Sequence, residues 1–342
     1  MKKLTYLILC LVLVVGLVGC GGKSDGKTSK EDDGKTYKLL LGSTVQDDSA
    51  LGVALLEHFK PYIEEHSKGR IKVEIQNNSV LGSDREIFEA VQMNTVQASQ
   101  GPLSTLANFD NDFAVCDLPF LFRSKEVAYK NLDGEFGKKM AEKLPENGMR
   151  ILAYGENSFR NISNNVRPIK TAKDLEGLKI RVMESPVNIA TYKAMKTNPT
   201  PMAFSELYSA LSQGAVEGQD NGIVLTYTNK LYEVQPYYTF TNHLYAANAV
   251  VISEQFWQSL PDDLQKVLLD GSKYAMKKQR ELNTQMEEDL VKKMETEGVE
   301  FIKMDDKEVD KLVEETKDVW NSVNLNEDLM KMAKKIRDKE NK

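Results

Sequence analysis

The run LKIRV (Leu178–Val182) and the longer stretch PTPMAFSELYSALSQGAVEGQDN (Pro199–Asn221) carry the strongest fold signal in this chain. In the first run apolar and basic residues alternate, which is typical of a strand that buries one face. Its three apolar residues would lie on one face, and Lys179 and Arg181 on the other. Loops at the ends of such strands are where an α/β protein usually holds a ligand.

The longer stretch contains a helical pattern. Apolar residues recur at helical spacing at Phe204, Leu207, Tyr208 and Leu211, with Ser205 as the expected cap and Gly214 as the expected end. The order strand, helix, turn, helix, strand predicts an α/β fold, and alternating strands and helices elsewhere in the chain agree with it.

These motifs resemble the DctP-type solute receptors of TRAP transporters, over a range from about Tyr37 to near the C-terminus. The other matching pieces are LGSDR (Leu81–Arg85), DLPFLF (Asp117–Phe122) and FRNISNNVRPIKTAKDLEGLKIRV (Phe159–Val182). The family usually has Asp and then Glu where this chain has Glu217 and Asp220, and often Pro where it has Gly222.

The resemblance implies a two-lobed periplasmic-binding-protein-like fold of type II, with mixed, mainly parallel sheets. We expect lobe I to comprise residues 37–156 and 247–286, and lobe II residues 157–246 and 287–342. A helical pattern without proline runs from Pro261 to about Glu297, before Gly298. At about 1.5 Å per residue this helix would be roughly 50 Å long. No heptad is sustained, so a helix lying across both lobes is favoured over a coiled coil.

The N-terminus reads as an export signal. Lys2 and Lys3 precede an apolar core that is too short for a comfortable membrane span. The sequence LVGC then indicates a bacterial lipobox, in which Cys20 would be lipidated after removal of residues 1–19. The alternative is an ordinary signal peptide with a chance cysteine. Residues 20–36, rich in Gly, Ser, Lys and Asp, are expected to form a flexible tether.

Composition limits the other classes of function. The 342 residues are 41% hydrophobic and 28% charged with a net charge of −6, which argues against nucleic acid as a partner. Cys116 would be the sole thiol left after processing and lipidation, and it is expected to be a buried small hydrophobe. The three histidines lack metal-type spacing and no G-x-S-x-G elbow occurs. Neither a cofactor nor an enzymatic activity is expected.

Candidate ligand-binding residues follow from strand ends and from the resemblance. Arginine binds a planar carboxylate through two parallel charge-assisted hydrogen bonds, and Arg181 ends a strand. From that position alone, a clamp and a solvated strand arginine are equally acceptable. The resemblance implies that Arg181 clamps the substrate carboxylate, that Asn221 helps to hold it, that Phe204 covers the ligand, and that Arg160 is a second binding arginine. The first lobe should add Gln46 or Asp47, and Asp84. Each has a simpler alternative role. Arg160 could be a surface charge and Asn221 a turn residue. Phe204 could pack on a helix face, and Asp84 could be an acid at a helix start.

Two positions bear on the ligand. Glu184, a further residue that is expected to bind the ligand, stands where the sialic-acid branch of the family has an amide, and Pro102 stands where it has an acid. Sialic acid is therefore not expected, whereas dicarboxylates and sugar acids remain.

The sequence thus predicts a lipid-anchored, monomeric extracytoplasmic receptor. It would capture a C4-dicarboxylate or a sugar acid such as a uronate, and deliver it to the membrane subunits of a TRAP transporter. The alternatives are a receptor of an ATP-driven importer, a sugar-acid hydrolase or lyase, and a structural lipoprotein.

Overall fold

The computed structural model describes residues 34–340, and all structural statements below concern these residues. The predicted signal segment, Cys20 and the tether as far as residue 33 lie outside them. None of the helices in the described range is long and apolar enough to cross a membrane.

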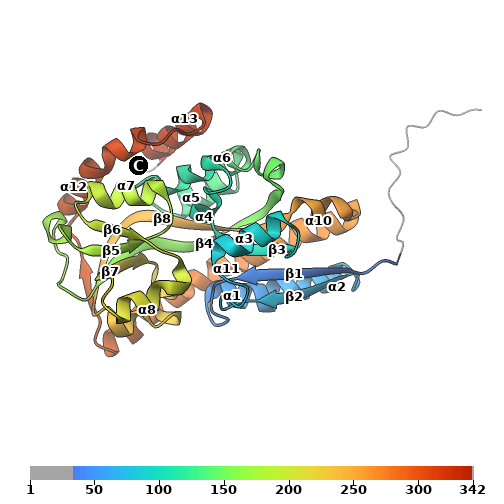
Figure 1. The fold of residues 1–342 in the computed structure, drawn as a ribbon, viewed down its shortest axis with the longest axis horizontal. Coiled ribbons are helices and arrows are strands. Elements are labelled where there is room, and N and C mark those ends of the chain that lie inside the picture. The colour runs from blue at the N-terminus through green and yellow to red at the C-terminus, as the bar shows by residue number, and fades with distance from the viewer. Residues whose placement is uncertain (1–33, 341–342) are drawn as a thin grey trace, which may run out of the picture. The chain divides into compact units, whose positions relative to one another are not determined.

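One mixed sheet organises the fold (Figure 1), with the strand order β2-β1-β3-β8-β4-β7-β5-β6 and with β9 paired to β8. The parallel pairs are β1–β2, β1–β3, β5–β6, β5–β7 and β8–β9, and the antiparallel pairs are β3–β8, β4–β7 and β4–β8. The strands are β1 (Tyr37–Ser43), β2 (Ile71–Gln76), β3 (Ala98–Pro102), β4 (Met149–Asn164), β5 (Lys179–Val182), β6 (Asn198–Pro201), β7 (Gly218–Asn221), β8 (Tyr237–Ser253) and β9 (Glu300–Lys303).

Helices pack on both faces of this sheet. They are α1 (Ala50–Val53), α2 (Lys60–His66), α3 (Asp84–Gln92), α4 (Leu103–Leu106), α5 (Lys125–Leu132), α6 (Glu135–Met140), α7 (Pro186–Ala194), α8 (Leu207–Ser212), α9 (Ile223–Thr228), α10 (Glu254–Ser259), α11 (Asp262–Thr296), α12 (Asp306–Thr316) and α13 (Glu327–Lys335). The α/β class expected from the sequence is confirmed.

Two regions of the sheet are joined by the long strands β4 and β8. We call β1, β2 and β3, residues 149–156 of β4 and 247–253 of β8, and the segments that connect β1 through β4 the first region. The second region comprises β5, β6, β7 and β9, with residues 159–164 of β4 and 237–245 of β8. These residues form one compact unit, so the lobe boundaries given above stay a prediction.

The joining strands are longer than the local sequence pattern indicates. The pattern gives one strand at 149–154 within β4 and two strands at 237–241 and 244–252 within β8, whereas β4 has 16 residues and β8 has 17. The pattern breaks because the β4–β8 register shifts between Glu156 and Phe159 and again between Arg160 and Ile162. Ser158 and Asn242 have positive φ angles of 60° and 44° at these irregular points. Such bulges bend and twist a strand without ending it.

Helix α11 contacts both regions, as expected for the long helix. Near its start Gly271 lies so close to Tyr62 and Ile63 that an added Cβ would come within 2.5 Å of the Ile63 side chain. In its middle Gln279 bonds both main-chain groups of Glu156, at 2.9 and 2.8 Å. Towards its end Leu290 packs in one core cluster with Tyr238 of the second region.

Two local expectations are corrected. Ser205 does not cap the helix, because the 3₁₀ turn Phe204–Glu206 begins there and Ala203 occupies the cap position. Tyr208 is 39% exposed, since the inner face of α8 is formed by Leu207, Ala210 and Leu211. Residues 50–66 form one continuous helical stretch, in which a π-helical segment (Ala54–Phe59) joins α1 to α2 just before Pro61. A wider turn there fits the missing N–H of proline.

The C-terminal residues pack against the first region. Trp320 donates to the main-chain oxygen of Pro119 at 3.1 Å, and Leu329 and Ala333 of α13 belong to the core cluster that contains Phe136. The expected assignment of residues 287–342 to lobe II stays a prediction, because the described residues form one compact unit. Cys116 is buried in the same cluster, as expected for a small hydrophobe, and burial raises the pKa of its thiol.

Candidate functional site: a pocket between the two regions

Carboxyl ends of parallel strands from both regions meet at one place. Thr44 directly follows β1 and Gln100 lies in β3, while Arg181 lies near the end of β5 and Asn221 ends β7. Strand ends leave side chains and main-chain groups free to face a ligand, so this junction is where an α/β fold is expected to bind one.

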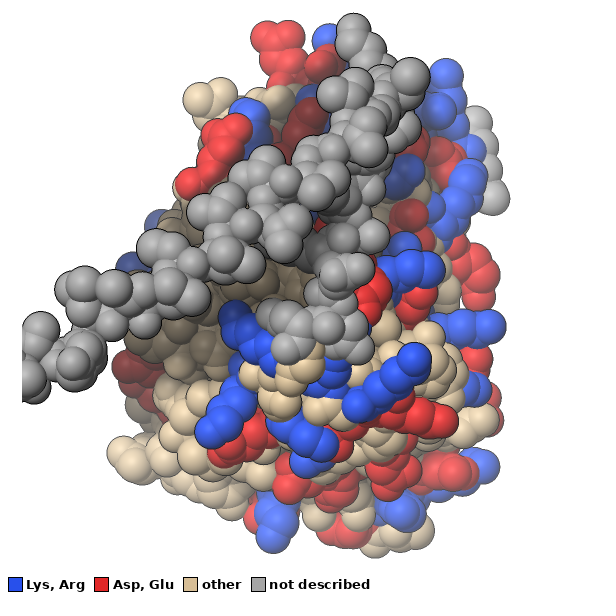
Figure 2. All heavy atoms as spheres, turned by 90° about the vertical axis from the view of Figure 1, so that its right-hand side faces the viewer, with Lys and Arg blue, Asp and Glu red and all other residues tan. Residues whose placement is uncertain are grey.

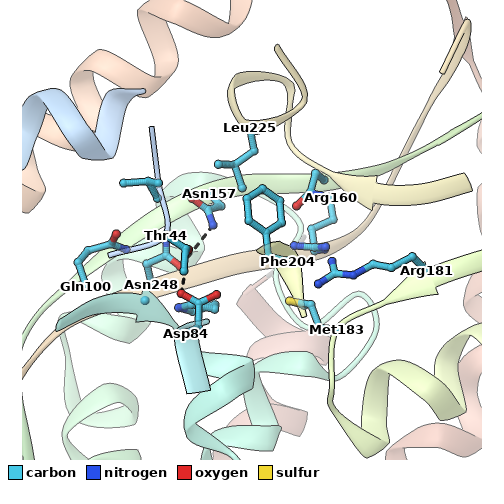
Figure 3. Close-up of a pocket in the computed structure, with 14 residues that line it drawn as sticks. Thr44, Asp84, Gln100, Asn157, Arg160, Arg181, Met183, Phe204, Leu225 and Asn248 are labelled. Carbon is cyan, nitrogen blue, oxygen red and sulfur yellow. Dashed lines mark hydrogen bonds between the residues drawn. The ribbon is translucent and has the colours of Figure 1, made fainter. Parts of the chain in front are cut away.

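A pocket lies at this junction, and its empty space of about 410 Å³ includes a part that is open to solvent. Figure 3 shows the two arginine head groups on one side and Asp84, Gln100 and Asn248 on the other. The lining residues are Thr44, Val45, Asp84, Gln100, Gly101, Pro102, Asn157, Arg160, Arg181, Met183, Phe204, Asn221, Leu225 and Asn248.

Arg181 is a buried cation without an ion pair. Its side chain is on a residue only 3% exposed, and no carboxylate within residues 34–340 lies at salt-bridge distance from it. Its Nε and Nη2 both donate to the main-chain oxygen of Met202, at 3.0 and 2.7 Å. Burial and the neighbouring Arg160 lower the pKa of Arg181 to about 10, so it stays charged at neutral pH. A buried charge of this kind calls for an anion.

The stretch that follows β6 positions this arginine. β6 pairs in parallel with β5 and contains Pro199 and Pro201, which the sheet tolerates because β6 is an edge strand. Met202 comes next, and its main-chain N–H donates to the oxygen of Val182 while its own oxygen accepts from Arg181. The proline-rich start of the motif therefore supplies the acceptor that orients the guanidinium.

Arg160 differs from Arg181 because its charge is already matched. Its Nε and Nη2 donate to the two carboxylate oxygens of Asp220 at 2.7 and 2.9 Å, and Nη2 also donates to the Asp220 main-chain oxygen. Both residues are almost fully buried. Although burial alone would raise it, the pKa of Asp220 lies far below its usual range, since Arg160 and the hydrogen bonds from Arg160 and His243 outweigh burial. The pair is fixed and leaves only Nη1 of Arg160 uncommitted.

Polar side chains behind this pair hold it in place. His243 Nε2 lies 3.3 Å from the Asp220 carboxylate and 3.1 Å from the Tyr192 hydroxyl, while its Nδ1 lies 2.8 Å from the Thr241 hydroxyl. Asn221 donates to Gln219 at 2.5 Å, which continues a chain of amides along β7. His243 therefore helps to hold the carboxylate of Asp220 in place.

The first region faces the pocket with amides. The carbonyl oxygen of Gln100 accepts from the Ser43 hydroxyl at 2.9 Å, and the Ser43 oxygen in turn accepts from the N–H of Val45. The carbonyl oxygen of Asn248 accepts from Asn157 at 3.4 Å. The amide nitrogens of Gln100 and Asn248 have no hydrogen-bond partner within the described residues, although both residues are at most 1% exposed. Buried donors without partners are unusual and indicate a missing acceptor.

Asp84 is the acid of the pocket. It begins α3, whose N-terminus carries a capping box formed by Ser83 and Glu86. Burial raises the pKa of Asp84 to about 6, although the hydrogen bond from Thr44 at 2.9 Å and the charge of Arg181 lower it. The nearby Glu184 raises it further.

The structure brings together five of the residues that were expected to bind ligand. Arg181, Arg160, Asn221, Phe204 and Asp84 all line the pocket.

The other three expected residues do not line it. Gln46 borders a neighbouring hollow and donates to Asn229, while Asp47 is exposed and accepts from Asn77. Glu184 is exposed at the outer edge, beside Arg181 and Met202.

Sequence reasoning missed four polar lining residues: Thr44, Gln100, Asn157 and Asn248. Asn248 gave a usable signal, because it is the single polar residue in the apolar run YAANAVVI. The others gave none, since a hydroxyl or amide near a strand end is common in any fold. Within residues 34–340 no group of three or more His, Cys, Asp or Glu side chains is arranged to hold a metal ion.

Comparison with known proteins identifies the class. Residues 41–326 match the family model of bacterial extracellular solute-binding proteins, family 7 (DctP). The chain belongs to this family, and it is a DctP-type extracytoplasmic solute-binding protein of the TRAP class. The resemblance inferred from the motifs is confirmed. Members of this family bind solutes rather than transform them, which also confirms that the chain is not an enzyme.

Individual relatives agree over most of the chain. It is 33% identical over 244 residues to the 2,3-diketo-L-gulonate-binding periplasmic protein YiaO of Escherichia coli, which covers 71% of this chain and 74% of that one. It is 31% identical over 308 residues to the C4-dicarboxylate-binding protein DctB of Bacillus subtilis, with 87% and 85% covered.

A solved structure has the same fold. It is the sugar acid binding protein DctPAm of Advenella mimigardefordensis in complex with galactonate, with a TM-score of 0.86 and 31% identity. The likeness covers 89% of this chain and 99% of that one. The predicted periplasmic-binding-protein fold is thereby confirmed.

Proposed function

We propose that this protein is a lipid-anchored receptor that captures a small organic acid in the pocket between its two regions and delivers it to the membrane subunits of a TRAP transporter. Arg181 binds the ligand carboxylate, Asn221 and Nη1 of Arg160 assist, Phe204 covers the ligand, and Asp84 contacts its far end. The acid is a sugar acid or a C4-dicarboxylate, the two classes named for the relatives YiaO, DctPAm and DctB.

One observation carries the proposal. Arg181 keeps its charge in a buried pocket, with a single main-chain oxygen as its acceptor. Its remaining N–H groups form the fork that matches a carboxylate bidentately. An unmatched buried charge is costly, and a carboxylate ligand removes that cost. The match to a family of solute-binding proteins supports a receptor rather than an enzyme acting on the same acid.

A thermal-shift screen of organic acids tests this function, because a ligand that binds only the native state raises its melting temperature. At least one sugar acid or dicarboxylate should raise the melting temperature of the purified protein by several degrees. Titration calorimetry then gives the affinity. Lys266→Ala, which removes an exposed cation paired to Asp270, is the control and should bind like wild type. If no acid of either class shifts the transition, the proposal is wrong.

The membrane anchor has a separate test. Cys20→Ser in the lipobox should abolish lipidation, so the variant should leave the membrane fraction or keep its signal segment. A variant that fractionates and migrates like wild type would show that Cys20 is not the anchor.

A further inference from the structure

The two sides of the pocket offer a ligand different charges. Among the fourteen lining residues the charged side chains are Arg160, Arg181 and Asp84. The charge of Arg160 is matched by Asp220 at 2.7 Å, which leaves Arg181 as the unmatched cation of this set. Across the pocket, the first region contributes no cation to the lining and contributes the carboxyl group of Asp84. The site therefore accommodates one negative charge at its Arg181 side.

The uncharged groups of the first region add a second constraint. The amide nitrogens of Gln100 and Asn248 each need an acceptor, and their carbonyl oxygens are already used. One carboxylate oxygen of Asp84 accepts from the Thr44 hydroxyl, and the other oxygen needs a hydrogen-bond donor from the ligand. A hydroxyl group both donates and accepts, so a hydroxylated carbon chain satisfies all three side chains. A second carboxylate would satisfy the amides but would meet Asp84 as a like charge.

We propose that the ligand is a polyhydroxylated monocarboxylate, with its carboxylate on Arg181 and its hydroxyl groups on Gln100, Asn248 and Asp84. This inference rests on the proposed function and narrows its substrate class, excluding C4-dicarboxylates as the preferred ligands. The pKa of Asp84 near 6 agrees with it, because this carboxyl is mostly ionised at pH 7.5 and repels a second carboxylate there. Figure 3 shows Asp84 and the two amides on the side of the pocket opposite the guanidinium groups.

Titration calorimetry at pH 7.5 with a matched set of ligands tests the inference. The sugar acids are D-gluconate, D-galactonate, L-gulonate and D-erythronate, and the dicarboxylate is succinate. Butyrate has the carboxylate without hydroxyl groups, and erythritol has hydroxyl groups without the carboxylate. The tightest sugar acid should bind at least tenfold more tightly than succinate, and at least a hundredfold more tightly than butyrate or erythritol.

Two variants assign the effect to the first region. Asp84→Asn keeps the size and removes the charge, so it should improve succinate binding at least fivefold relative to the tightest sugar acid. Gln100→Met removes the donor, so it should weaken the sugar acid at least fivefold and leave butyrate, which has no acceptor for this donor, within twofold. Asp262→Asn and Gln213→Met are the controls. Asp262 also begins a helix but is exposed, and Gln213 is an exposed glutamine beyond α8. Circular dichroism checks that all variants are folded.

The outcomes separate the two proposals. Succinate binding as tightly as the best sugar acid, with loss of binding in Arg181→Ala, would overturn the narrower class and leave the organic-acid receptor intact. Unchanged ligand ratios in both Asp84→Asn and Gln100→Met would likewise overturn it. Failure of every acid to bind would remove both.

Discussion

The first and second regions direct carboxyl ends of parallel strands at the same pocket, yet they place opposite chemistry there. The second region brings the buried residues Arg160 and Arg181 to the pocket, and the charge of Arg160 is neutralised within the fold. The first region brings amides and Asp84. The backbone arrangement thus locates a site in both regions, whereas the side chains decide which end of a ligand each region receives.

The two arginines of the second region differ from each other in a similar way. Both are buried, but Arg160 is bonded to a carboxylate and Arg181 to a main-chain oxygen. A paired buried charge is compensated within the fold, whereas an unpaired one is available to a ligand. Outside the pocket, charge behaves differently: on the face seen in Figure 2 acidic and basic side chains are interspersed, as on a solvated surface.

The largest effect is expected from Asp220→Asn, which leaves Arg160 buried without its anion. Breaking a buried ion pair by removing one partner costs about 3–5 kcal/mol, and urea denaturation should show a loss of this size. Glu254→Gln is the matched control, because it breaks the more exposed Arg150–Glu254 pair and should cost only about 1 kcal/mol. Equal losses in the two variants would mean that burial does not distinguish the pairs.

Arg181→Ala should damage binding rather than stability. The ligand carboxylate would lose its partner in a buried site, which costs about 3 kcal/mol or more and corresponds to roughly a hundredfold weaker binding. The unfolding free energy without ligand should stay level or rise, since an unmatched buried charge is removed. Calorimetry and urea denaturation of the same preparation check both parts. An affinity within a fewfold of wild type in the folded variant would remove Arg181 from the site.

The same conservative change at both arginines sharpens the contrast. Lysine keeps the charge but loses the planar fork. Arg181→Lys should weaken binding about tenfold with little effect on stability. Arg160→Lys should weaken binding only a fewfold and should instead lower the unfolding free energy by about 1–2 kcal/mol, because it loses hydrogen bonds to Asp220. A larger loss of affinity in Arg160→Lys, or a larger loss of stability in Arg181→Lys, would contradict the roles assigned to the two arginines.

The smallest effect is a pH dependence from Asp84. Its folded-state pKa is raised from 3.8 to about 6, so the folded state holds this proton more tightly than the unfolded chain does. Stability linked to Asp84 is therefore present below about pH 4 and is lost as the pH rises to about 6 and beyond. The stability of Asp84→Asn relative to wild type should increase between pH 4.5 and pH 7.5 in urea denaturation. A constant difference across this range would contradict the raised pKa.

Local patterns predicted much of this fold. Strand alternation at Leu178–Val182, the proline start and glycine end of α11, and the matching motifs identified the α/β class, the long helix and the family. These features depend on side-chain period, capping and backbone freedom over a few neighbouring residues, which the sequence records directly. The sequence also singled out Arg181, Arg160, Asn221, Phe204 and Asp84, which the fold brings to one pocket.

Only the tertiary structure decided how these residues are used. The sequence gives no sign that Asp220 would neutralise Arg160 and leave Arg181 unmatched, because that pair joins residues 60 positions apart across β4 and β7. It could not show that Gln100 and Asn248 keep amide donors without partners, since this depends on which contacts the fold leaves unmade. Local propensity acts between neighbours along the chain, whereas charge pairing and burial act through space. Charge pairing and burial therefore decide which end of the ligand each region binds.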